Sequence, residues 1–131
     1  MGVRQPFAIG SISASVAAPA AAETLIVSSP PLIVAVDGAP VMVMTSMTVL
    51  IGVGVTAINY LLRRGTTTTG LVVTGQLGGG NLSETASLTV MRTLMALDNP
   101  GSVGPVQYSF TLTSVGGAST VGSCSIAVLS L

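Results

Sequence analysis

Few side chains in this 131-residue sequence could perform chemistry. The chain has no histidine and no lysine, so the usual general bases and amine nucleophiles are missing, and it has only four acidic residues. These carboxylates are widely separated, each in a sequence typical of a turn: Glu23, Asp37, Glu84 and Asp98. A pair of carboxylates could act as acid and base in hydrolysis, but turn chemistry explains these positions better. We expect no catalytic residues and no enzymatic activity.

Cofactor and metal sites are equally hard to assemble. Cys124 is the only cysteine, and one thiol with scattered acids is not a metal ligand set. The segment IGVGVTA (51–57) has the glycine spacing of a dinucleotide-binding loop. That site needs a helix after the glycines and an acidic residue about 20 positions later, and no acid follows before Glu84. We expect neither cofactor nor metal, and interpret Gly52 and Gly54 as bends or close-packing points in a strand.

The charge content restricts the partners. Charged residues make up 6% of the chain and the formal net charge is zero, whereas soluble domains average about 25%. A monomer with so few charges tends to associate, so we expect the chain to work inside an assembly. Four arginines are too few for binding through phosphates, and no apolar run reaches the roughly 18 residues of a membrane-spanning helix. We therefore expect neither a nucleic acid nor a membrane as partner.

Half of the positive charge lies in NYLLRRGTTTTG, residues 59–70. The alternating strand pattern before Arg64, the glycine after it and the fresh apolar run after Gly70 predict a hairpin. We expect Arg63 and Arg64 to pair with Glu84, Asp98, a neighbour's carboxylate or backbone carbonyls, because the guanidinium fork suits such partners.

From residue 23 onward, short apolar runs alternate with turn residues at intervals typical of a sandwich or barrel. About eight strands are predicted: 24–29, 32–36, 41–55, 57–64, 70–77, 86–97, 106–115 and 119–131. The segment LGGGNLS (77–83) is predicted to be a loop. The fold class is thus an all-β antiparallel sandwich, jelly-roll-like.

Side-chain alternation predicts the core. Tyr108, Phe110 and Leu112 point to one side of their strand, and the intervening residues give the other side a hydroxyl-covered surface. Cys124 repeats the inward pattern as a small buried hydrophobe. Met42 and Met44 share one strand face while valines share the other, so this strand is expected in the middle of the sandwich or at a subunit interface.

Residues 1–22 differ from the rest, with one charge, Arg4, two prolines and neither helical nor strict strand period. We expect an extended N-terminal arm that lies against its own domain or a neighbour, in preference to an uncleaved export signal. Small residues would let its backbone pair with an edge strand of a host groove. Two parts are therefore predicted, the arm (1–22) and the β-sandwich domain (23–131).

The chain resembles small β-sandwich proteins that decorate the capsids of bacteriophages and related viruses, including those with a jelly-roll like that of tumour necrosis factor. The resemblance rests on the hairpin YLLRRGTTTTG (60–70), the closing pair VQYSFTLTS and STVGSCSIAVLSL, and the histidine-free composition rich in Thr, Ser and Gly. It spans about residues 23–131. It implies a homotrimer on the outer surface of the capsid that clamps neighbouring subunits of the major capsid protein.

We therefore expect a virion structural protein, a capsid decoration or cement protein. The alternative is a receptor-binding or fibre-head module, which would be expected to expose aromatic side chains in a loop. Three of the four aromatic residues instead fall in strand patterns. The candidate interface residues are Arg4, Phe7, Ile9, Met42, Met44, Arg63 and Arg64.

Overall fold

The computed structural model describes residues 7–34, 36–73, 80–83 and 88–131, the stretch 80–83 as backbone only. These residues contain no helix, and their strands form two packed antiparallel sheets with a small ribbon at one end. The strands are β1 Phe7–Ser11, β2 Val16–Ala18, β3 Thr24–Ser28, β4 Leu32–Val34, β5 Val41–Leu50, β6 Ala57–Arg64, β7 Gly80–Ser83, β8 Thr89–Asp98, β9 Gly104–Val106, β10 Tyr108–Val115 and β11 Ser119–Ser130.

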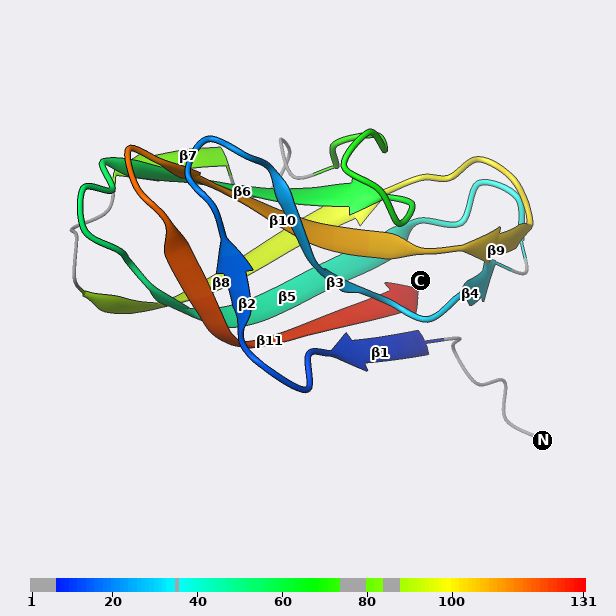
Figure 1. The fold of residues 1–131 in the computed structure, drawn as a ribbon. Helices are drawn as coiled ribbons and strands as arrows, with labels where there is room; N and C mark the ends of the chain where they lie inside the picture. Colours follow the sequence, from blue (N-terminus) through cyan, green and yellow to red (C-terminus); the bar gives the residue numbers. More distant parts are fainter. Residues whose placement is uncertain (1–6, 35, 74–79, 84–87) are drawn as a thin grey trace.

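One sheet has the strand order β1-β11-β5-β8, with β2 also paired to β11, and the other has the order β3-β10-β6-β7 (Figure 1). The β4–β9 ribbon lies at the end where β11 finishes. Along one side the two sheets approach closely. A Cβ added to Gly10 of β1 would lie 2.5 Å from the Ser28 carbonyl oxygen of β3. Glycine therefore allows β1 to close the sandwich against β3.

The core lies between the two sheets and follows the predicted alternation. Tyr108, Phe110 and Leu112 are fully buried, and Phe110 stacks on Tyr60 with ring centroids 6.4 Å apart. Cys124 belongs to the opposite sheet and is also buried in this core. Burial of these large side chains supplies the main free energy of folding. The predicted all-β antiparallel sandwich, jelly-roll-like, is confirmed.

Three local expectations need correction. The predicted loop 77–83 contains β7, which pairs with β6, because tertiary pairing can override a weak strand propensity. Within the predicted strand 70–77, only an isolated bridge between Val72 and Arg63 is described, and residues 74–79 lie outside the described part. The strand predicted over 41–55 ends at Leu50.

The early end of that strand has a clear cause at Gly52. A Cβ there would lie 1.7 Å from the Ala118 carbonyl oxygen, and one on Gly117 would lie 2.2 Å from the Val53 carbonyl oxygen. The loops after β5 and β10 therefore stack backbone against backbone, as the close-packing interpretation of Gly52 predicted. No helix follows the glycines, which removes the basis for a dinucleotide site.

Most of the predicted arm is joined to the main sheet. β1 pairs along residues 125–129 of β11, and β2 pairs along residues 119–121 of the same strand. Ala8 and Ala18 belong to the core. Arg4 lies outside the described residues. The strands of segment 7–18 are thus extended, and they pair with β11 of the chain's own sandwich domain.

Candidate functional site

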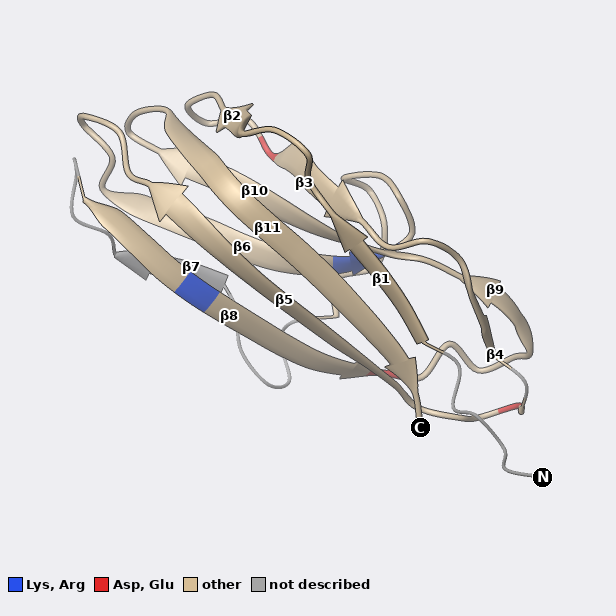
Figure 2. Ribbon diagram, turned by 90° about the horizontal axis from the view of Figure 1, so that it is seen from below, with Lys and Arg blue, Asp and Glu red and all other residues tan. Residues whose placement is uncertain are grey.

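The four strands β1, β11, β5 and β8 present a broad outer face (Figure 2). It carries four of the seven predicted interface residues, Phe7, Ile9, Met42 and Met44. Residues directly opposite one another in antiparallel strands point to the same side of a sheet. The pairing places Phe7, Leu129, Met42 and Leu97 in one row across the sheet, and Ile9, Ala127, Met44 and Met95 in the next. We call these eight residues the apolar half of the outer face.

Exposure identifies this apolar half as a real surface feature. Phe7 is 68% exposed and Ile9 is 60% exposed, and Met44 and Met95 are exposed as well. The alternate residues of β5, such as Val43, are fully buried. The structure therefore brings together the candidate residues Phe7, Ile9, Met42 and Met44 from two separate segments.

Hydroxyl groups occupy the continuation of the same face. The next two rows contain Ser11, Ser125, Ser46 and Thr93, then Ser123, Thr48 and Met91. We call these seven residues the hydroxyl half of the outer face. Hydroxyls bond across neighbouring strands, with 3.3 Å between the oxygens of Ser46 and Thr93 and 3.1 Å between those of Ser123 and Thr48. Because these side chains are short, a depression of about 410 Å³ lies over them.

No charged side chain belongs to either half of the outer face. Figure 2 shows these four strands tan except on β8, where Arg92 is blue and the last residue, Asp98, is red. Arg92 lies opposite Met47, a core residue, so its position alternates with the outward Met91 and Thr93. The face therefore combines exposed apolar side chains with neutral hydroxyls.

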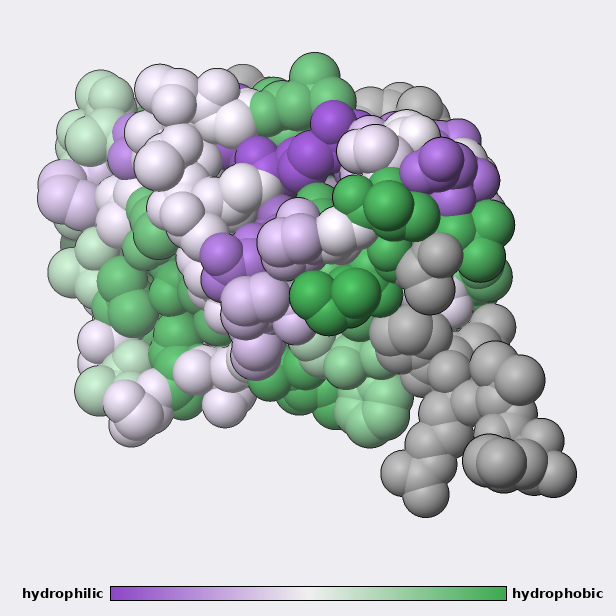
Figure 3. Space-filling view, turned by 90° about the vertical axis from the view of Figure 1, so that its right-hand side faces the viewer, coloured by the Kyte–Doolittle hydropathy of each residue, from purple (hydrophilic) through white to green (hydrophobic). Residues whose placement is uncertain are grey.

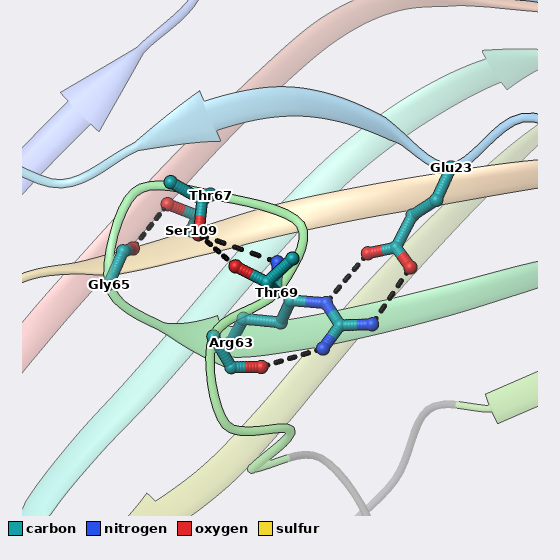
Figure 4. A network of polar contacts seen from close by, with 7 residues as sticks. Glu23, Arg63, Gly65, Thr67, Thr69 and Ser109 are labelled. Atoms are coloured by element: carbon teal, nitrogen blue, oxygen red, sulfur yellow. Dashed lines mark hydrogen bonds and ion pairs between the residues drawn. The ribbon is translucent and has the colours of Figure 1, made fainter.

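Arg63 is engaged within the chain on the other sheet (Figure 4). Its Nε and Nη2 donate to the Glu23 carboxylate at 2.6 and 2.8 Å, and its Nη1 donates to the Gly70 carbonyl at 2.6 Å. The hydrogen bonds from Arg63 hold the pKa of Glu23 below its ordinary value. The partner is therefore Glu23, whereas Glu84, which sequence analysis named, lies outside the described residues.

The same network buries part of the surface that was expected to be exposed. The Ser109 hydroxyl donates to the Gly65 carbonyl at 2.6 Å, under the loop that Thr67 and Thr69 brace with a 3.0 Å hydroxyl contact (Figure 4). Ser109 and Thr111 are fully buried. The expectation of a hydroxyl-covered outer surface on β10 was wrong, because the loop and the ion pair lie over it.

Arg64 makes the second ion pair, which sequence analysis did anticipate. Its Nε and Nη2 donate to the two carboxylate oxygens of Asp98 at 2.8 and 2.7 Å, and the Tyr108 hydroxyl donates to the same carboxylate at 2.6 Å. Burial opposes ionisation of Asp98, but the hydrogen bonds from Arg64 and Tyr108 outweigh it, so the pKa of Asp98 lies below its ordinary value. The pKa of Tyr108 is raised, by burial first and then by its bond to Asp98.

These two pairs occupy the guanidinium groups of both candidate arginines inside the fold. Arg63 and Arg64 join the hairpin to Glu23 and to the end of β8, which is a structural role. An interface role for them stays a prediction.

A second apolar surface lies at the end of the molecule that carries the β4–β9 ribbon (Figure 3). Ile33, Val36 and Val103 are each more than half exposed there, close to polar side chains. Sequence analysis did not single out these residues. Ile33 alternates with the buried Leu32 and Val34 of β4, and Val103 lies outside the predicted strands.

Chemical groups other than these pairs are sparse. In the described part of the chain, no three side chains of His, Cys, Asp and Glu come together as a metal site. Burial raises the pKa of the Cys124 thiol, which lies 3.6 Å from the Thr45 hydroxyl. A buried thiol of raised pKa is a poor nucleophile. The described residues also include no helix that could span a membrane.

The chain is, by its architecture, a jelly-roll-like sandwich, and its fold is similar to those of solved virus and TNF structures. One structure of infectious bursal disease virus, Gx strain, matches with a TM-score of 0.67 and 10% identity, covering 97% of this chain and 32% of that chain. The T13 particle of the same virus matches with a TM-score of 0.62 and 10% identity over 94% of this chain and 31% of that chain. This chain thus spans about a third of the length of those virus proteins.

The third comparison is with a protein of similar length. The Eiger TNF of S. frugiperda matches with a TM-score of 0.50 and 12% identity, covering 96% of this chain and 93% of that chain. At these identities the likeness establishes the fold. No protein-family model matches the sequence, and no curated protein matches it by sequence.

Proposed function

We propose that this chain is a structural protein of a virion and acts as a capsid decoration or cement protein of a bacteriophage or related virus. In this role it sits on the outer capsid surface as a homotrimer and contacts the major capsid protein. It carries no catalytic activity of its own.

The observation that carries the proposal is the outer face of the β1-β11-β5-β8 sheet. An exposed sheet with two apolar rows and no charged side chain is unusual for a free monomer, and such patches mark interaction sites. The resemblance to the fold of infectious bursal disease virus supports the virion setting. The absence of a metal-ligand cluster among the described residues agrees with a role based on contact.

The test is the abundance and place of the chain in purified particles. We expect many copies per particle, at a fixed ratio to the major shell protein. Stripping the chain under mild conditions should leave intact particles that lose heat resistance, and adding it back should restore that resistance. Absence from particles would contradict the proposal, and presence at only a few copies on a fibre would favour the receptor-binding alternative.

A further inference from the structure

We propose that a second copy of this chain docks on the outer face of the β1-β11-β5-β8 sheet, with the apolar half at the centre of the contact and the hydroxyl half at its rim. This inference rests on the self-association included in the proposed function. It adds the surface that makes the contact.

Continuity is the first argument. The two apolar rows cross all four strands without interruption, from Phe7 on β1 to Leu97 on β8. Scattered apolar residues on a surface need no explanation, but a contiguous patch does. The patch also lies on the side of β5 opposite the core, where Met44 alternates with the fully buried Val43. The core uses the other side, and none of the described residues covers this one, so it is free to receive a second molecule.

Size is the second argument. Three strands of ten to twelve residues and the five-residue β1, about 4.8 Å apart, cover about 550 Å² in projection. Side-chain relief raises the accessible area above this value, which brings it close to the roughly 800 Å² that each partner contributes to a stable interface. The whole face, with its apolar centre and polar rim, therefore has the size and the layout of a stable contact.

Charge is the argument for a second copy as the occupant. Arg92 lines the depression over the hydroxyl half, but the apolar half offers no countercharge, so a partner with charged groups would lose their hydration against it. A copy of the same face brings no charge, offers apolar rows to apolar rows, and presents hydroxyls that act as donor and acceptor to one another. The face is therefore complementary to copies of itself, and in the homotrimer three such faces meet around the threefold axis, each in contact with both neighbours.

The first experiment separates the two halves of the face by substitution. We expect Met44→Glu and Ile9→Glu, both in the apolar half, to weaken self-association at least tenfold in sedimentation velocity at micromolar concentration. The matched control is Met91→Glu at the rim, where an 80% exposed side chain tolerates a charge, and it should stay associated. Circular dichroism and thermal unfolding show whether each variant is folded. Folded Met44→Glu and Ile9→Glu proteins that remain associated like the wild type would overturn the proposal.

The second experiment compares methionine oxidation in the wild-type oligomer with oxidation in a monomeric variant. Hydrogen peroxide transfers one oxygen to a thioether, giving the sulfoxide and water, and peptide mass spectrometry gives the rate at each methionine. We expect Met44 and Met95 to oxidise more slowly in the wild-type oligomer than in the monomeric Ile9→Glu variant. Met91 should react quickly in both proteins, and Met47, which is buried in the core, slowly in both.

The outcomes separate this inference from the proposed function. Equal rates at Met44 and Met95 in the oligomer and the monomer would show that the face is uncovered, while self-association and the virion role would stand. A wild-type chain that stays monomeric at all concentrations would overturn the docking face and the homotrimer together. Decoration of capsids is decided separately, by the copy number in particles.

Discussion

The carboxylate of Asp98 links three strands. Asp98 is the last residue of β8, and its carboxylate accepts two hydrogen bonds from Arg64 of β6 and one from Tyr108 of β10. Asp98 is nearly fully buried, so an unpaired charge there would be costly, and each donor has a measurable effect.

We expect Tyr108→Phe to lower the free energy of unfolding by about 1–2 kcal/mol, because it removes one hydrogen bond to a charged acceptor and leaves the ring in place. Urea unfolding measures the change. The control is the same substitution in an Asp98→Asn background, where its effect should shrink because the charged acceptor is gone. An equal loss in both backgrounds would mean that the hydroxyl acts through another group.

Stability should depend on pH at both extremes and stay flat between them. The folded pKa values of Glu23 and Asp98 lie below their unfolded values, so the folded state binds fewer protons and stability is lost as pH falls below about 4. The folded pKa values of Cys124 and Tyr108 lie above their unfolded values, so stability is lost as pH rises above about 9.

The sequence has no histidine, so no side chain of that type titrates between these limits. Urea midpoints from about pH 3 to about pH 11 test the expected plateau. The Asp98→Asn variant should lose less stability than the wild type on acidification. A stability maximum at acidic pH would contradict the assignment of both ion pairs.

Among the elements, the stacked loops after β5 and β10 depend on glycine more than any strand does. We expect Gly52→Ala to cost about 3 kcal/mol or more, since its Cβ would overlap the rigid Ala118 carbonyl oxygen at 1.7 Å and force the backbones apart. The matched control is Gly122→Ala, whose Cβ would meet only the Thr48 carbonyl oxygen at 3.9 Å.

Thermal unfolding compares the two variants. Gly122→Ala should change stability by less than about 0.5 kcal/mol, because the space is open. Similar behaviour of the two proteins would show that the loops can separate without cost.

The strands were predictable where alternation was strong. β10 and β11 carry strict inward patterns, and both were expected within a residue or two of their bounds. β7 was missed because its glycine and asparagine are poor strand formers and only pairing with β6 makes it a strand. The turn at residues 65–70 was predictable from its glycines and threonines.

The candidate site was predictable only in part. Phe7, Ile9, Met42 and Met44 were named as interface residues, but their spacing in sequence does not show that they are neighbours. That juxtaposition needs the register of β11, which lies between β1 and β5 and starts more than 65 residues after the end of β5. Met95 was not among the candidate interface residues, and its pairing with Met44 places it on the face.

At the scale of the whole molecule, the two ion pairs lie away from the apolar half of the outer face. Arg63 pairs with Glu23 beside β3, and Arg64 of β6 pairs with Asp98 at the end of β8, which joins the two sheets. The eight residues of the apolar half include no charged side chain. Internal ion pairs therefore stabilise one side of the sandwich. The other side exposes apolar side chains, and burying them against a partner lowers the free energy of the system.

This distribution makes the salt dependence of self-association a prediction. Screening by salt acts on charges, and the apolar half at the centre of the contact has none, so sodium chloride from about 0.05 to about 1 M should leave the association constant nearly unchanged. Sulfate salts are excluded from apolar surface and should strengthen the contact. Sedimentation velocity over the two salt series measures both effects, with Met91→Glu as the control that adds a charge at the rim. If sodium chloride instead dissociates the oligomer, the contact must involve charged groups such as Arg63 or Arg64, because only a charged contact responds to screening.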